Sequence, residues 1–134
     1  MKRLLGCAAV VHLVFGVFLA SSLSSAVSAE SPVSVDGIVF ARSVEFREPV
    51  GAAKEFEVSI TQVFCWTKLS AKTPPAAVKH VWYKAGERLL EVPFTLNHSS
   101  GRYWSVKNVS AGDWTIEVVG ANGEVFGSGS FKVK

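Results

Sequence analysis

After the first 29 residues, apolar and polar side chains alternate along most of the chain, and this period of two limits the possible folds more than any other feature. In a β-strand, successive side chains point to opposite faces, so such alternation gives one apolar and one polar face. No stretch of a dozen residues carries apolar side chains at the spacing of a helix face. The pattern therefore predicts an all-β protein. The clearest alternation lies within residues 55–66, where one parity holds Phe56, Val58, Ile60, Phe64 and Trp66.

Turn residues divide the alternating region into seven predicted strands. Asn122-Gly123 and Gly86-Glu87 are hairpin signals, and Pro74-Pro75 marks a loop. Seven short strands with regular turn signals in one small domain predict an immunoglobulin-like antiparallel β-sandwich. The expected strands cover residues 38–47, 55–66, 78–85, 88–96, 102–109, 114–119 and 124–133.

The beginning of the chain is typical of a signal peptide. Lys2-Arg3 precedes an apolar run over residues 4–20, and small residues follow up to Ala29. A retained membrane anchor is the alternative, but His12 in the run and the Ser-rich stretch behind it disfavour one. We expect residues 1–29 to be cleaved off and residues 30–134 to form one β-sandwich domain. The mature protein would be periplasmic or secreted, with no stable membrane insertion.

Charge excludes one class of partner. The whole chain has 14 Lys and Arg against 11 Asp and Glu, but Lys2 and Arg3 fall in the predicted signal peptide. The remaining excess is a single positive charge, which is too small to favour binding to nucleic acid. We therefore expect no nucleic-acid partner.

Cysteine content bears on disulfides and on the oligomeric state. Cleavage would remove Cys7 and leave Cys65 alone, so no disulfide can form within the domain. Cys65 stands between Phe64 and Trp66, without a neighbouring base that would lower its pKa. We expect Cys65 to be a small buried hydrophobic residue at a strand end and the protein to be a monomer. A disulfide between two chains and a reactive thiol are the alternatives.

Aromatic side chains are numerous for a small domain without a disulfide. Most are expected to stabilise the core, because each buries a large apolar area. The alternative is an aromatic platform that stacks on sugars. The residues assigned to the core by their parity are Phe56, Phe64, Phe94, Trp104, Trp114 and Phe131.

Catalytic and cofactor motifs are absent from the sequence. His80 and His98 form no spaced pair, and no nucleophile elbow, phosphate-binding loop or Cys-x-x-Cys is present. A metal site would have to gather Cys65, His80 and His98 from distant segments without a fourth ligand. We therefore predict no catalytic residues, no metal and no cofactor.

One predicted hairpin supplies the candidate binding residues. A two-residue turn at Gly86-Glu87 places His80, Trp82 and Lys84 on the face opposite the apolar stripe of the following strand. A three-residue loop would shift the register by one residue and turn Trp82 inward. We adopt the outward register, which predicts a recognition patch around these three residues. Tyr103 and Lys107 join it if the strands lie side by side.

The second half of the chain resembles a bacterial family catalogued as domain of unknown function 2914. The resemblance rests on His80-Val81-Trp82-Tyr83 with Glu91-Val92-Pro93-Phe94, on residues 102–107, and on the Gly-Asp-Trp strand at residues 112–119. It covers about residues 64–133. Ala85 stands where the family often has Asn. The resemblance implies a bacterial exported domain and carries over no catalytic residues.

Three functions are compatible with these observations. We expect a non-catalytic module that binds an envelope protein or assembles with one. A module that binds carbohydrate or cell-wall glycan (peptidoglycan) through exposed aromatic residues is the main alternative. A small exported enzyme or metal carrier is the third.

Overall fold

The computed structural model describes residues 31–134, and these residues contain ten strands and no helix. The all-β prediction is thus confirmed. The predicted signal peptide at residues 1–29 and its predicted cleavage before Glu30 lie outside the described residues. A helix long and apolar enough to cross a membrane is not found within residues 31–134.

Seven of the ten strands have nine or ten residues, and three have two or three. The long strands are β1 (Val33–Ala41), β5 (Gln62–Ala71), β6 (Ala76–Lys84), β7 (Glu87–Leu96), β8 (Ser100–Asn108), β9 (Gly112–Gly120) and β10 (Val125–Val133). The short strands are β2 (Ser43–Glu45), β3 (Glu48–Val50) and β4 (Glu55–Phe56).

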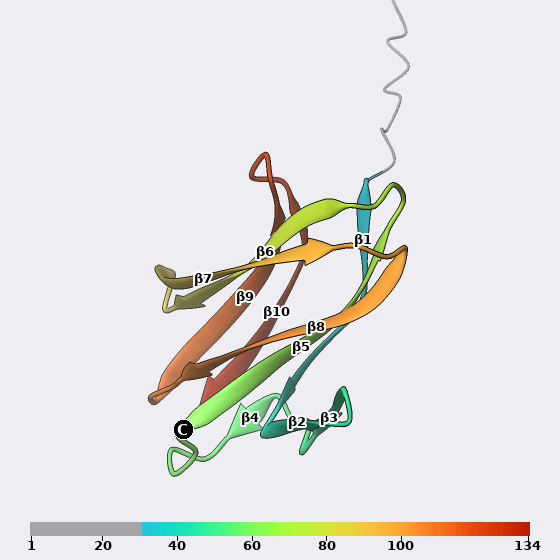
Figure 1. The fold of residues 1–134 in the computed structure, drawn as a ribbon. Coiled ribbons are helices and arrows are strands. Elements are labelled where there is room, and N and C mark those ends of the chain that lie inside the picture. Colours follow the sequence, from blue (N-terminus) through green and yellow to red (C-terminus); the bar gives the residue numbers. More distant parts are fainter. Residues whose placement is uncertain (1–30) are drawn as a thin grey trace, which may run out of the picture.

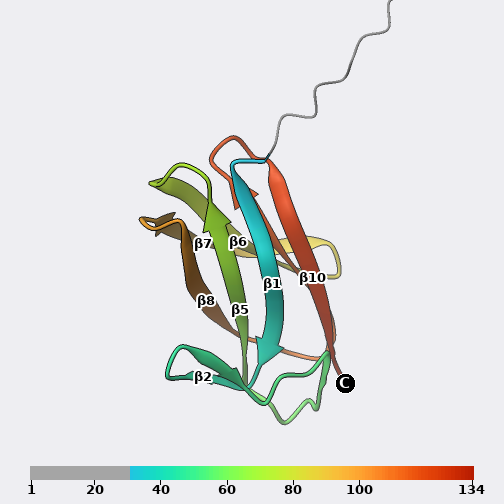
Figure 2. The ribbon, with the colours of Figure 1, turned by 90° about the vertical axis from the view of Figure 1, so that its right-hand side faces the viewer.

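The strands form two large sheets and one separate hairpin (Figure 1). One sheet has the order β1-β5-β8, the other has the order β4-β10-β9-β6-β7, and β2 pairs with β3. All neighbours are antiparallel except β4 and β10, which are parallel. Seen from the side, β1 runs next to β10, so the two large sheets meet along these strands (Figure 2).

The core lies between the two large sheets and consists of two clusters of buried side chains. Each cluster takes residues from both sheets, as expected when two sheets bury their apolar faces against each other. The first contains Phe40, Phe56, Val63, Cys65, Trp82, Trp114, Ile116, Phe131 and Val133. The second contains Val33, Leu69, Ala71, Val78, Leu96 and Val118.

Small residues in β10 allow the sheets to approach each other beside β1. A Cβ added at Gly129 would lie 3.1 Å from Ile38 Cγ2 and from the Phe40 ring, and one added at Gly127 would lie 3.0 Å from Val35 Cγ2. These distances are too short for ordinary van der Waals contact. The two glycines therefore make room for the β1 side chains that close this side of the core.

The predicted inward parity is wrong for β5 and β8. On β5 the odd-numbered residues Val63, Cys65 and Leu69 face the core, whereas Phe64 lies on the outer face. On β8 Ser105 is buried and Val106 is exposed. Both parities of β5 carry apolar residues, so alternation alone did not identify the inner face. The core assignments of Phe56, Trp114 and Phe131 are confirmed, Phe94 packs against the second cluster, and Phe64, Trp66 and Trp104 belong to the outer face.

The strands predicted at residues 38–47 and 55–66 are each interrupted in the structure. The first ends at Ala41 and is followed by the β2–β3 hairpin, and the second is divided into β4 and β5 by residues 57–61. Val58 in this interruption is exposed. An apolar residue at the expected parity was therefore not sufficient to indicate a continuous strand.

Candidate functional site

The turn between β6 and β7 has a different geometry from the predicted one. Lys84 pairs with Glu87, so the two turn residues are Ala85 and Gly86, with φ of 48° and 82°. Two positive φ angles are what a type I′ turn requires. The register then shifts between Trp82 and Tyr83.

This shift determines which face His80 and Trp82 occupy. Beyond it, Trp82 pairs with Leu90 and His80 with Val92, so both share the inner face with the apolar stripe of β7. Both side chains are completely buried. The outward register and the recognition patch centred on these two residues were therefore wrong. A bulge in β7 that the turn sequence does not reveal is the physical reason.

The polar atoms of these side chains join a hydrogen-bonded chain that crosses from one sheet to the other. Trp82 Nε1 donates to Ser105 Oγ at 3.0 Å, and Ser105 Oγ lies 2.7 Å from His80 Nδ1. His80 Nε2 lies 3.0 Å from Thr67 Oγ1, which donates to the Tyr103 carbonyl at 2.7 Å. No buried side-chain polar atom of residues 31–134 lacks a partner.

The chain of bonds fixes the position of every proton in it. Thr67 donates its only proton to the Tyr103 carbonyl, so it must accept from His80 Nε2–H. His80 Nδ1 is then the acceptor for the Ser105 hydroxyl, whose oxygen accepts from Trp82. Burial lowers the pKa of His80 from 6.5 to about 4. The imidazole is therefore neutral at physiological pH and protonated on Nε2.

The Ser105–His80 pair has the hydrogen bond of a nucleophile and its base, but both residues are buried. Ser105 is 5% exposed and His80 is 0% exposed. A substrate would have to enter the space between the sheets to contact the hydroxyl. The pair therefore links the two sheets and cannot act as a nucleophile while the domain remains folded.

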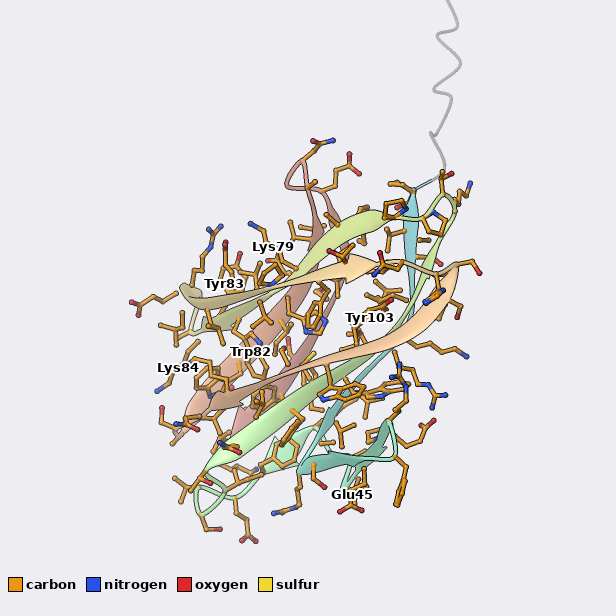
Figure 3. The ribbon with its side chains drawn as sticks, viewed as in Figure 1. Glu45, Lys79, Trp82, Tyr83, Lys84 and Tyr103 are labelled. Carbon is orange, nitrogen blue, oxygen red and sulfur yellow. The ribbon has the colours of Figure 1, made fainter. Side chains whose placement is uncertain are left out.

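Lys84 and Lys107 come together at the margin of the core. Each places its Nζ 5.8 Å from the centre of the Trp114 ring, and Lys84 Nζ also donates to Ser110 Oγ at 2.6 Å. Tyr103 lies on the inner side of β8, where its ring is 5.8 Å from that of Phe94 (Figure 3). The five predicted patch residues thus occupy three separate environments.

Cys65 is buried and free, and burial raises the pKa of its thiol. It lies in the interior of β5 and not at the expected strand end. In residues 31–134 no group of three or more His, Cys, Asp and Glu side chains is placed to hold a metal ion.

The most unusual surface feature is the tip of the β2–β3 hairpin, which the sequence analysis did not identify. Glu45 pairs with Glu48, so Phe46 and Arg47 form the turn, with φ of 50° and 66°. Residues with a Cβ pay roughly 1–2 kcal/mol for each left-handed conformation. Phe46 is 97% exposed at this strained position.

The hairpin is held firmly against the outer face of β5 and β8. Trp66 Nε1 donates to the Arg47 carbonyl at 2.9 Å, and the Arg47 guanidinium lies 5.8 Å from the centre of the Trp104 ring. Arg102 forms an ion pair with Glu48. These contacts explain why Trp66 is almost completely buried on an outer face.

A polar pocket of about 460 Å³ lies between the hairpin and this face. Three of its side chains are cationic and one is anionic, giving the pocket a net charge of +2. Its lining includes Arg47, Glu48, Trp66, Lys68, Gly101 and Arg102. We consider the exposed Phe46 and this basic pocket together as the candidate site, and name them the hairpin site.

Comparison with known families confirms the resemblance noted in the sequence. A family model described as protein of unknown function (DUF2914) matches residues 75–133. The matched segment covers β6 to β10, whereas the β2–β3 hairpin and β5 precede it. Among curated proteins, none matches the chain.

Proposed function

We propose that this protein is an exported, non-catalytic module that binds another protein of the bacterial cell envelope through the hairpin site. The observation that carries the proposal is the fully exposed Phe46 on a strained turn. Strain of this kind concentrates at functional positions, where the surrounding structure maintains it. Asn-Gly would form the same turn without strain, but it would remove both side chains.

The geometry of the tip suits a protein partner. Exposed aromatic side chains and arginines are the residues that most often anchor protein interfaces. The bond from Trp66 and the contact with Trp104 keep Arg47 in place, so the turn loses little conformational freedom on binding. Phe46 and Arg47 together form a preorganised anchor.

The sheet orders support an immunoglobulin-like sandwich as the framework. Numbered among themselves, the seven long strands form sheets in the orders 1-2-5 and 4-3-6-7. A constant-type immunoglobulin domain has strands 1, 2, 5 and 4 in one sheet and 3, 6 and 7 in the other. The present arrangement follows from moving the fourth strand to the second sheet, and the β2–β3 hairpin is an addition between the first two long strands.

Binding to carbohydrate or peptidoglycan is a less suitable function for this surface. Sugar rings stack on open aromatic faces, but Trp66 is 8% exposed and the Arg47 guanidinium lies over Trp104. On this surface the aromatic residue with a fully exposed ring is Phe46. We therefore place the glycan alternative, and the small enzyme or metal carrier, behind a protein partner.

Site-specific crosslinking tests the proposal. A photoreactive residue at position 46 of the full chain, expressed in its native cells, should give a discrete adduct with one envelope protein. The same residue at Val125, which is 56% exposed on β10, is the matched control and should give none. Equal adducts from both positions, or none from position 46 together with sedimentation on peptidoglycan, would contradict the proposal.

A further inference from the structure

We infer that the pocket of the hairpin site binds a carboxylate of an acidic peptide segment, and that an apolar side chain next to this carboxylate contacts Phe46. The inference rests on the proposed function and specifies the chemistry of the partner. It assigns the pocket and the hairpin tip to one continuous surface.

The net positive charge of the described domain is matched by that of this pocket. Residues 31–134 contain twelve Lys and Arg and ten Asp and Glu, an excess of two positive charges. Arg47, Lys68 and Arg102 against Glu48 give the same excess within the pocket alone. The remainder of the domain is therefore balanced, so an anionic partner is attracted to this surface in preference to others.

Two of the three cationic side chains in the pocket can bind a carboxylate of a ligand. Lys68 on β5 lies opposite Arg102 on the neighbouring strand β8. It forms no ion pair with any residue of the described domain. Arg102 contacts Glu48, which is more than half exposed and can be joined by a second carboxylate. Asp36, the next acidic residue along this face, is bonded to Ser34 and Ser70 and does not line the pocket.

The occupant is inferred to be a peptide and not a small anion. The pocket already holds one carboxylate, that of Glu48, in an ion pair with the Arg102 guanidinium. Phe46 directly precedes Arg47 in the turn, so its exposed ring belongs to the residue next to the pocket lining. A free anion would leave that ring in water, whereas an acidic segment with an apolar residue covers it.

Nuclear magnetic resonance provides a local readout. The indole N–H of Trp66 bonds to the Arg47 carbonyl, so its ¹⁵N–¹H signal reports on the pocket. A blocked hexapeptide of alternating Glu and Leu should shift this signal in a saturable way. A hexapeptide of alternating Lys and Leu should leave it unchanged, and hexaglutamate should bind more weakly.

Variants assign the two halves of the surface. Lys68→Gln should weaken binding of the Glu–Leu peptide about threefold to fivefold, as expected for one exposed ion pair. Lys132→Gln, which removes the same charge from β10 outside the pocket, should not change it. Phe46→Ser should remove the preference for the Glu–Leu peptide over hexaglutamate.

Several results would overturn the inference. These are an equal response to the Lys–Leu peptide, an equal effect of both lysine variants, and the same shift with inorganic phosphate at the same concentration. Sedimentation on vesicles of anionic phospholipid, without a response to the Glu–Leu peptide, would instead assign the surface to a membrane. A crosslinked protein at position 46 together with no peptide binding would refute this inference and leave the proposed function standing. Peptide binding without a crosslinked protein would support the acidic-peptide site and contradict the proposed envelope partner.

Discussion

Acid should destabilise this protein through His80. The imidazole is fully buried, accepts a hydrogen bond from Ser105 and donates one to Thr67. Protonation of Nδ1 would convert it from an acceptor into a donor and leave the Ser105 hydroxyl proton without its acceptor. The folded state therefore resists a proton that the unfolded chain takes up readily.

The magnitude follows from the pKa of His80, which burial lowers from 6.5 to about 4. Between these two pH values the unfolded state binds one more proton than the folded state, so stability falls as the pH falls. Each pH unit costs about 1.4 kcal/mol, and the whole interval costs roughly 3 kcal/mol. Well above pH 6.5 the contribution of His80 is complete and independent of pH.

Urea unfolding followed by tryptophan fluorescence, between pH 7.5 and 4, measures the effect. His80→Gln is the control, since its amide can donate to Thr67 and accept from Ser105 but does not titrate. Both proteins lose the exposed ion pairs alike in acid, so the difference between their free energies of unfolding isolates His80. We expect the wild-type protein to be more stable at pH 7.5 and this advantage to shrink by roughly 3 kcal/mol by pH 4.

Parallel curves for the two proteins across this range would refute the reasoning. They would mean that His80 takes up a proton equally in the folded and unfolded states, and hence that its burial does not keep it neutral.

Three further predictions concern other parts of the chain. Ala85→Asn should raise the free energy of unfolding by about 1 kcal/mol, because Asn tolerates the positive φ of the β6–β7 turn; a lower melting temperature would contradict the assigned turn. Trp114→Ala should lower the free energy of unfolding in urea by roughly 3–5 kcal/mol, because the ring stacks on Phe131 within the first core cluster. Intact-mass measurement of the exported protein should show a chain that begins at Glu30, and retention of residues 1–29 would reject the predicted cleavage.

The sequence predicted the fold class because strand periodicity and turn residues are local signals. It also indicated a buried, free Cys65 and three aromatic residues of the core. It did not predict the inner face of β5, because the β2–β3 hairpin covers the outer face and makes apolar residues favourable on both. Which of two apolar parities faces the other sheet depends on tertiary contacts that no local pattern encodes.

The hairpin site was missed for a related reason. Phe46-Arg47 contains neither Gly nor Asn, the residues that mark a two-residue turn, so the sequence pattern predicts one strand over residues 38–47. Arg42, a charged residue at the parity of Ile38, Phe40 and Val44, was the available signal, since β1 ends just before it. Functional turns that tolerate strain are the places where turn chemistry in the sequence is expected to fail.

The buried hydrogen bonds that connect Trp82 to the Tyr103 carbonyl also fix how the two sheets are aligned. Apolar contacts are non-directional, so sheets that slid past each other by one residue pair could recover much of their buried area. These hydrogen bonds could not re-form after such a slide, because their donors and acceptors come from β5, β6 and β8 in one order. Each group left without a partner would cost about 1–3 kcal/mol. A few hydroxyl and ring nitrogen atoms thereby select one offset of the sheets from several that the hydrophobic effect alone would accept.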